Sequence, residues 1–294
     1  MIELKFDTMT KIILKNILYV LFIMNEFERA IEASSLSDKS ITTYGYTYKR
    51  LFDLIGDTIL SFSEKELIKE LKSFDIKPMS VSSMISVIML IRKHNDLSND
   101  ELIKYRTKLV DNHYENKIVS NETLKDELPS IATLTAYTNK LYGDGKYQDF
   151  MINYILLNYN TRNMDLQMKF LSNKKDADKS DNYIYATTKY LVYVRNDYKT
   201  NDKYKTLITK IYNSKMRKSF SELLGSKNSI DFIDASNLNT FIMNRTYNKL
   251  GEGRYVKSVL MEYAENGNIN GFIKVSKSRP TSLEVLMRDY KIDK

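Results

Sequence analysis

The chain has 294 residues, of which 43% are hydrophobic, and it carries a formal net charge of +8. This length suits two domains, and the apolar content is sufficient for a core in each, which argues against global disorder. The sequence holds no cysteine, 2 histidines and 9 glycines, with no GxxxxGK(S/T) or GxGxxG pattern. We therefore expect no disulfide, no thiol nucleophile, no metal cluster of cysteine or histidine, and no nucleotide-binding loop.

The excess of positive charge favours a polyanionic partner, either nucleic acid or an anionic membrane surface. One stretch, 11–24, is strongly apolar, but it is short for a bilayer span and is interrupted by Lys15 and Asn16. No small-residue cleavage site follows it, which argues against a signal peptide. We expect this N-terminal extension, 1–24, to contain a helix that docks on this chain or on a neighbouring copy, without membrane contact.

Residues 25–115 show helical spacing of their apolar side chains and are predicted to form one compact helical domain. Ser37 or Asp38 is expected to cap a helix that contains TTYGYTYKRLFDLI. Ser63, with Glu66 three residues later, forms a capping-box pattern at the start of the next helix. Two further helices are expected in MSVSSMISVIMLIRKHND and SNDELIKYRTKLVDNHY.

A polar stretch without a sustained apolar face, 116–130, is predicted to be a linker, and 131–294 to be a second domain. This domain begins with helices, and the spacing then changes in 182–211, which is rich in Tyr, Val, Ile and Thr. That composition predicts two or three antiparallel strands, with turns near Thr187 and near Asn201–Asp202, before helices resume. The predicted fold is therefore mainly α, with a small antiparallel β-sheet in the C-terminal domain.

An arginine follows the apolar helix that precedes these strands. In TRNMDL, Arg162 is followed three residues later by Asp165. A guanidinium donates two parallel hydrogen bonds to phosphate oxygens and stays charged when it is desolvated. An acid at i+3 shares its helix face and can orient it. The pair fits a phosphate-binding site, although an exposed Arg–Asp helix pair has the same spacing.

The order of these parts, with a tyrosine near the end of the chain, resembles the tyrosine recombinases, the phage-integrase family of DNA strand-exchange enzymes. LSDKSITTYGYTYKRLFDLIGD and MSVSSMISVIMLIRKHND resemble helices of the family's SAM-like core-binding domain, and 131–294 resembles its catalytic domain. The similarity lies in order and spacing, with few identical residues. The abundance of Lys, Asn, Ile and Tyr indicates an AT-rich genome and a divergent viral branch.

The resemblance implies a role for Arg162, which would grip a non-bridging oxygen of the scissile phosphate while Asp165 orients it. It also implies that a lysine in the following hairpin acts as general acid toward the leaving 5′ oxygen. NDYKTNDKYKT offers Lys199, Lys203 and Lys205. Lys199, before the turn, is preferred and Lys203 is next, although surface lysines are common in hairpins.

A second phosphate-binding arginine is implied at the start of a later helix, where Arg254 lies, with Arg245 as the alternate. The family has a histidine three residues before this arginine. This chain has Gly251 before Arg254 and Ile242 before Arg245. Both histidines of the chain lie in its N-terminal half, so neither fills that place by sequence order.

The implied nucleophile is Tyr290, in MRDYKID. The family places a further histidine or tryptophan shortly before it; this chain does not, and Lys277 and Arg279 are the alternates as donors to the phosphate. A phenol with a pKa of about 10 attacks poorly alone, but two arginines near the phosphate stabilise its phenolate form and the transition state. A packing tyrosine on an amphipathic terminal helix is the alternative interpretation.

Three functions remain open. The first is a site-specific recombinase or integrase that cleaves and rejoins double-stranded DNA through a 3′-phosphotyrosyl intermediate, without metal or cofactor, as a dimer to tetramer on DNA. The second is a catalytically degenerate DNA-binding protein on the same fold, which the missing histidines favour. The third is a helical structural or interaction protein. A recombinase would act inside the host cell, in cytoplasm or nucleus, or be packaged in a virion. Many family members carry a further helix after the tyrosine, so 11–24 is this chain's candidate for subunit contacts.

Overall fold

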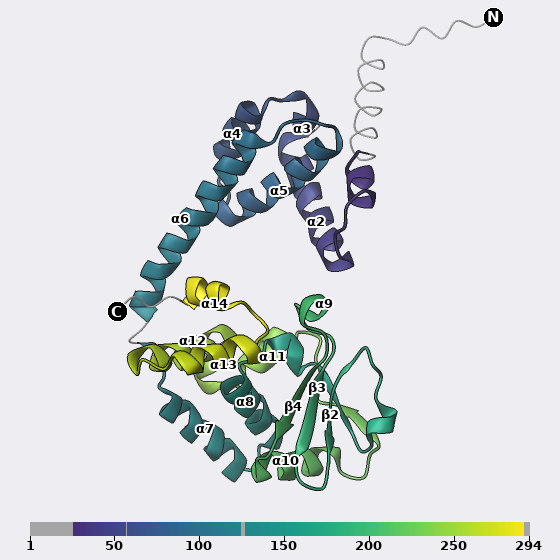
Figure 1. Cartoon of the computed structure of the whole chain (residues 1–294), viewed down its shortest axis with the longest axis vertical. Helices are drawn as coiled ribbons and strands as arrows, with labels where there is room; N and C mark the ends of the chain where they lie inside the picture. Colours follow the sequence, from purple (N-terminus) through teal and green to yellow (C-terminus); the bar gives the residue numbers. More distant parts are fainter. Residues whose placement is uncertain (1–25, 57, 125–126, 291–294) are drawn as a thin grey trace, which may run out of the picture. The chain divides into compact units, whose positions relative to one another are not determined.

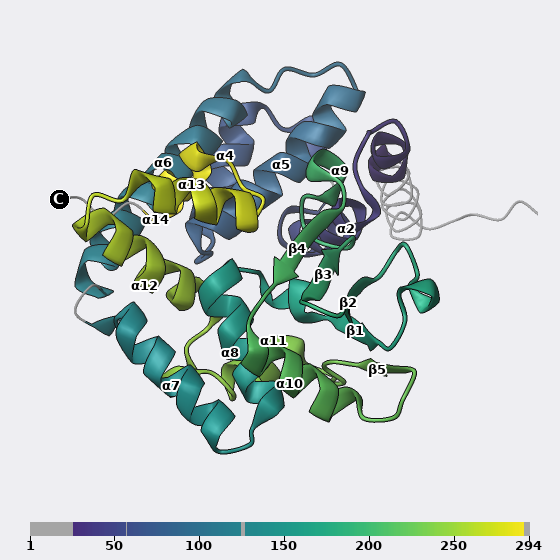
Figure 2. The same ribbon diagram turned by 60° about the horizontal axis from the view of Figure 1, so that its bottom comes forward.

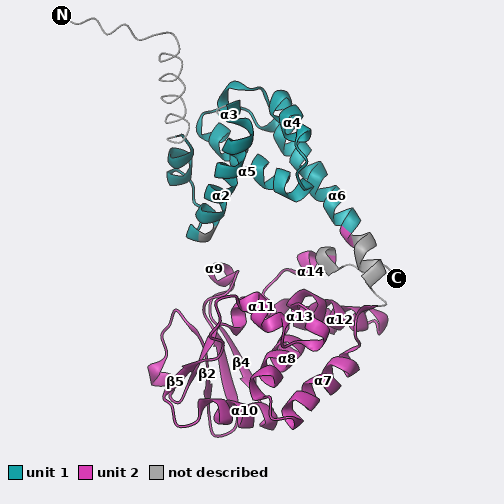
Figure 3. Ribbon diagram, turned by 180° about the vertical axis from the view of Figure 1, so that it is seen from behind, with its two compact units in different colours: residues 1–116 teal, residues 117–294 magenta. Residues whose placement is uncertain are grey.

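A computed structural model of the chain describes residues 26–56, 58–124 and 127–290 (Figure 1). The chain divides into two compact units, 1–116 and 117–294, which are described separately (Figure 3). Within the described ranges, no helix combines the length and the apolar character that crossing a bilayer requires. The predicted apolar extension, 1–24, lies outside them.

The first unit is built from helices, as its apolar spacing predicts. After a helical stretch at 26–32, these are α2 (Asp38–Ile55), α3 (Thr58–Ser61), α4 (Glu64–Ser73), α5 (Pro78–His94) and α6 (Asp100–Leu124). The predicted caps are confirmed, because Ser37 accepts a hydrogen bond at the start of α2, and Ser63 with Glu66 forms a capping box at the start of α4. Residues of α2, α4 and α5 share one core, in which Leu51 and Leu67 are fully buried.

Helix α6 extends beyond the start of the predicted linker. The helix continues to Leu124, and the boundary between the compact units lies within it, after residue 116. Residues 116–124 contain neither proline nor glycine, the two residues that most disfavour a helix, so nothing in this stretch stops α6 from continuing. Pro129 comes next, and α7 (Ile131–Gly143) begins after its N-cap, Ser130.

The second unit combines helices with one sheet. Its longer helices after α7 are α8 (Tyr147–Tyr159), α10 (Ser214–Leu224), α11 (Leu238–Met243), α12 (Glu252–Glu265), α13 (Ile269–Ser278) and α14 (Leu283–Tyr290). Its short helical turns are η2 (Asn163–Leu166), η3 (Lys174–Asp176), α9 (Asn201–Tyr204) and η4 (Tyr247–Lys249). Its strands are β1 (Met168–Leu171), β2 (Asn182–Ala186), β3 (Leu191–Arg195), β4 (Leu207–Ile211) and β5 (Ser229–Asp231).

The sheet has the order β4-β3-β2-β1-β5. Strands β2, β3 and β4 pair antiparallel, with connections at the two predicted turns, which confirms the strands expected in 182–211. The prediction of a purely antiparallel sheet is wrong, because β1 pairs parallel to β2 and antiparallel to β5. These two added strands have four and three residues, which is too short for the alternation that reveals a strand in sequence.

The helices α7, α8, α12 and α13 lie together beside the sheet (Figure 2). Helix α8 is at the centre of this layer, since it contacts α7, α10 and α12, and it is buried nearly all round. Phe170 of β1 connects the sheet to the helices, because the centre of its ring lies 4.9 Å from the ring centre of Phe220 on α10. The ring centre of Phe232 lies 4.7 Å from that of Phe170. The candidate site begins where α8 ends.

Candidate functional site

One pocket of the second unit brings together four of the cationic residues selected from the sequence. Its volume is about 370 Å3, and Arg162, Lys199, Lys203 and Arg279 all line it. They come from three segments that are far apart in the chain: the end of α8, the connection between β3 and β4, and the turn between α13 and α14. The start of α14 completes the wall of the pocket.

Arg162 reaches this pocket because α8 stops abruptly. Asn160 ends the helix in the left-handed conformation, with φ of 49° and ψ of 35°, which asparagine tolerates better than most residues. Thr161 is fully buried, and Arg162 follows in an extended conformation with its side chain half-buried. A buried helix therefore ends on a guanidinium because the left-handed residue redirects the chain toward the pocket.

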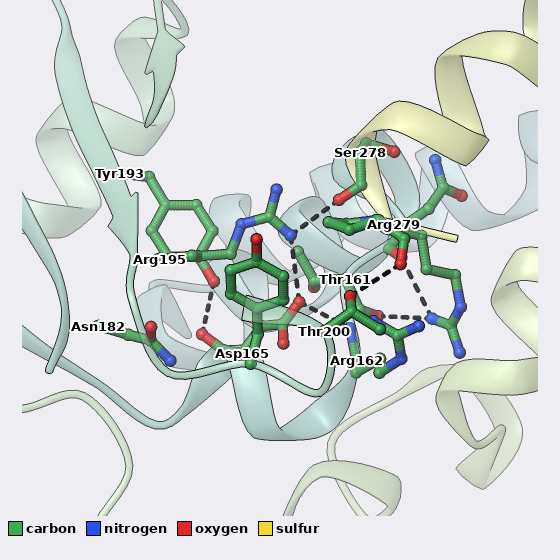
Figure 4. A network of polar contacts seen from close by, with 12 residues as sticks. Thr161, Arg162, Asp165, Asn182, Tyr193, Arg195, Thr200, Ser278 and Arg279 are labelled. Atoms are coloured by element: carbon green, nitrogen blue, oxygen red, sulfur yellow. Dashed lines mark hydrogen bonds and ion pairs between the residues drawn. The ribbon is translucent and has the colours of Figure 1, made fainter. Parts of the chain in front are cut away.

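Asp165 holds Arg162 through the backbone. Its Oδ2 accepts a hydrogen bond from the Arg162 N–H at 3.2 Å, and its own N–H donates to the Arg162 carbonyl at 3.0 Å. The same Oδ2 forms an ion pair with Arg195 Nη1 at 3.1 Å (Figure 4). Asp165 is fully buried, and burial raises the pKa of its carboxyl, although Arg195 opposes the rise. These two hydrogen bonds join Asp165 to the backbone of Arg162, and the charge of Arg162 also opposes the rise in the pKa of the Asp165 carboxyl.

Arg195 lies outside the lining of the pocket but supports it through Asp165, and it was not selected from the sequence. It ends β3 with 2% of its side chain exposed, and its Nη1 also donates to the carbonyl of Ser278 at 2.8 Å, at the end of α13. Arg195 shares a strand face with Leu191 and Tyr193, which both lie in the main core. The position of an arginine on the core-facing side of a strand is a sequence feature that could have identified Arg195, because such a charge is buried only when it is paired.

Arg279 joins the turn before α14 to the segment that carries Arg162. Its side chain is buried, and its Nη1 donates to the carbonyls of Asn160 at 3.2 Å and Thr161 at 3.1 Å (Figure 4). Its Nη2 forms an ion pair with Glu252 at 2.7 Å. The sequence predicted Arg279 only as an alternate donor, and it is the second arginine that lines the pocket.

The two lysines lie on the connection between β3 and β4, as the hairpin prediction required. Lys199 precedes α9 and Lys203 lies within it, and both side chains are exposed. The connection is attached to the floor of the pocket, because Thr200 Oγ1 donates to the Pro280 carbonyl at 3.0 Å. The Lys203 ammonium lies 5.3 Å from the centre of the Tyr204 ring, within the range of a cation–π contact.

Three other predicted cations lie elsewhere in the second unit. Arg254 is exposed on the first turn of α12 and is not part of the pocket lining. Arg245 forms an ion pair with Asp149 at 3.3 Å, and its guanidinium lies 3.4 Å from the centre of the Phe241 ring. Lys277 is exposed and lines a separate groove beside β4.

The predicted nucleophile, Tyr290, is the last residue of α14, and its side chain lies outside the part of the chain that the structure describes. Val285 and Leu286 of the same helix line the pocket. The two histidines, His94 and His113, are in α5 and α6 of the first unit. The pocket thus combines Arg162, Lys199 and Lys203, whose charges suit a phosphate, with the helix that carries the predicted tyrosine.

Comparisons of the chain with protein-family models, with curated proteins and with solved structures found no match. The assignment of a function therefore depends on the chemistry of this pocket.

Proposed function

We propose that the chain is a DNA strand transferase of the tyrosine-recombinase type, which cleaves and rejoins double-stranded DNA through a 3′-phosphotyrosyl intermediate. The observation that carries the proposal is the meeting of Arg162, Lys199, Lys203 and Arg279 in one pocket that is lined in part by the helix that ends at Tyr290. Guanidinium and ammonium groups at this density suit a phosphodiester, because arginine matches two phosphate oxygens at once.

The reaction is an exchange of phosphodiester bonds. The Tyr290 oxygen attacks the phosphorus and releases its proton to solvent water. The bond from phosphorus to the 5′ oxygen breaks, and Lys199 or Lys203 gives a proton to that leaving oxygen. Arg162 neutralises the charge that develops on the non-bridging oxygens. A 5′-hydroxyl then gives its proton back to the lysine and attacks the phosphotyrosine, and the leaving tyrosine oxygen takes a proton from water. Both the DNA and the tyrosine are restored, so the bond energy is kept and no cofactor takes part.

DNA binding in this proposal is largely electrostatic. A net charge of +8 supports phosphate contacts over a duplex, and their affinity should fall steeply with salt. The helical first unit would bind the same DNA, as the core-binding domain does in the family that the sequence resembles. Assembly of a dimer to tetramer on DNA belongs to the same proposal.

The test is covalent trapping. The full chain is incubated with nicked duplexes made from the ends of its source genome, and a protein–DNA adduct that survives denaturation is sought. The adduct should disappear in Tyr290→Phe. It should persist in Tyr212→Phe, a matched control at a residue that is 67% exposed directly after β4 and outside the pocket lining.

A second function is favoured by a specific observation. Arg254 lies outside the pocket lining, both histidines lie in the first unit, and Arg279 is held by carbonyls and a carboxylate. These features suit a DNA-binding protein that has lost strand cleavage. Tight, salt-dependent binding of the same duplexes without an adduct would support this function and contradict the first.

A further inference from the structure

A single carboxylate connects two walls of the pocket, namely the segment that carries Arg162 and the turn before α14. Glu252 is the first residue of α12, and its Oε1 accepts a hydrogen bond from Arg279 Nη2 at 2.7 Å. Its Oε2 accepts from the backbone N–H of Asn163, the residue after Arg162. Glu252 does not line the pocket itself and was not selected from the sequence.

The contacts form a closed circuit around the base of the pocket. Arg279 Nη1 donates to the carbonyls of Asn160 and Thr161, while Glu252 binds both Arg279 and Asn163. The segment from Asn160 to Asn163 is therefore held at both ends, with Arg162 between them. The other partner, Arg279, begins the turn from which α14 starts, so the same circuit anchors the helix that ends at Tyr290.

We propose that Glu252 is a positioning residue for strand cleavage, which holds the Arg162 segment and the turn before α14 in one fixed geometry. The inference rests on the proposed function, since the geometry matters for a reaction between Tyr290 and a phosphate at Arg162. Catalytic groups that shift by about 1 Å can lose about 100-fold in rate, so a single anchor shared by both walls has a large effect on the rate.

The charge of Glu252 makes this role distinguishable from a contribution to DNA binding. Its carboxylate pairs with Arg279 and offsets one positive charge beside the pocket. Removal of the negative charge should leave DNA affinity unchanged or raise it, because phosphate then meets a less neutralised arginine. The rate of cleavage and the affinity for DNA should therefore not fall together.

Glu252→Gln is the informative variant because it keeps the size of the side chain. A carboxylate presents two acceptor oxygens, whereas an amide presents one acceptor and one donor. Glu252 faces two donors, Arg279 Nη2 and the Asn163 N–H, so the glutamine must lose one contact. Glu262→Gln is the matched control, since Glu262 lies on the same helix and accepts from the Ile131 N–H at 3.1 Å, outside the pocket lining.

The experiment uses the full chain and the same nicked duplexes. Single-turnover adduct formation is measured at saturating DNA, and Kd is measured by titration. We expect Glu252→Gln to form the adduct at least about ten-fold more slowly with an unchanged or lower Kd, and Glu262→Gln to match the unsubstituted chain. Hydrogen exchange by mass spectrometry should be faster over 160–166 in Glu252→Gln only. Arg279→Met should slow cleavage, and adding Glu252→Gln to it should cause little further loss, because both act through one circuit.

Cleavage by Glu252→Gln at the original rate would overturn the inference while leaving the proposed function intact. Equal losses of rate and affinity, or additive losses in the double variant, would overturn it as well. If Glu252→Gln does not fold, Glu252→Asp replaces it, because the shorter acid cannot reach both partners and should show the same separation of rate from Kd. If the unsubstituted chain forms no adduct, the proposed function fails, and so does the role of Glu252 in cleavage. Unchanged hydrogen exchange over 160–166 in Glu252→Gln would separately show that Glu252 does not hold this segment in place.

Discussion

Replacement of Arg195 by methionine should test the buried ion pair beneath the pocket. Arg195 and Asp165 pair at 3.1 Å with side-chain exposures of 2% and 0%. The variant leaves Asp165 buried opposite an apolar side chain, and removal of one partner from a buried pair costs about 3–5 kcal/mol. For a unit of this size, a loss of about 3 kcal/mol lowers Tm by roughly 6–12 °C.

The cost should depend on pH. Burial already raises the pKa of Asp165 in the folded chain, and the variant removes the charge that opposes the rise. An acid with a raised folded pKa contributes its stability below its unfolded value of about 4 and loses it as pH rises through the folded value. The difference in the free energy of unfolding between the original chain and Arg195→Met should therefore be smallest near pH 4 and increase as pH rises above 4.

Urea unfolding followed by circular dichroism, repeated from pH 4 to pH 7, measures both effects. Lys169→Met is the control, because it breaks an ion pair of 2.7 Å with Asp181 whose side chains are 46% and 35% exposed. That loss should be at most about 1 kcal/mol. Adding Asp165→Asn to Arg195→Met should recover stability at pH 7, because no unpaired charge remains. Equal losses in the two single variants, or a loss independent of pH, would refute the reasoning.

Other variants test the remaining parts of the molecule. Arg162→Lys keeps the charge but loses two-point binding of phosphate. The rate of strand cleavage should therefore fall about 100-fold or more, while DNA affinity stays within a few-fold. Equal cleavage rates in the variant and the unsubstituted chain would show that Arg162 does not act in cleavage. Glu64→Gln should cost the first unit about 1 kcal/mol, measured by thermal unfolding, because Glu64 accepts from two backbone N–H groups at the start of α6, at 2.7 and 3.0 Å. Burial alone would raise the pKa of the Glu64 carboxyl, but its hydrogen bonds lower that pKa overall. The stability that Glu64 contributes should therefore be present above the usual pKa of 4.5 and be lost as pH falls below it. Deletion of 1–23 should reduce the oligomeric state on DNA in mass photometry, and an unchanged assembly would contradict a role for 11–24 in subunit contacts.

Some residues of the site and its supports can be predicted from the sequence and others cannot, for a physical reason. Arg162 was visible because a charge at the end of an apolar helix is a local feature. Arg195 and Glu252 were missed because their partners are distant, with Arg195 and Asp165 30 residues apart and Asn163 and Glu252 89 apart. Arg279 was only an alternate, since its distance along the chain gave no sign that it folds back onto Asn160.

Local chemistry determined much of this protein from the sequence alone. Helix spacing, the caps at Ser37 and Ser63, and the antiparallel strands in 182–211 depend on residues two to four positions apart, so their signals can be read without a fold.

The tertiary structure alone decided how these pieces meet. It brought the four-residue strand β1 alongside β2 in parallel, made Arg279 rather than Arg254 line the pocket, and joined the pocket walls through Glu252. Such contacts depend on long-range packing, in which a buried charge takes whichever partner the fold brings within reach, and no short pattern in the chain encodes that choice.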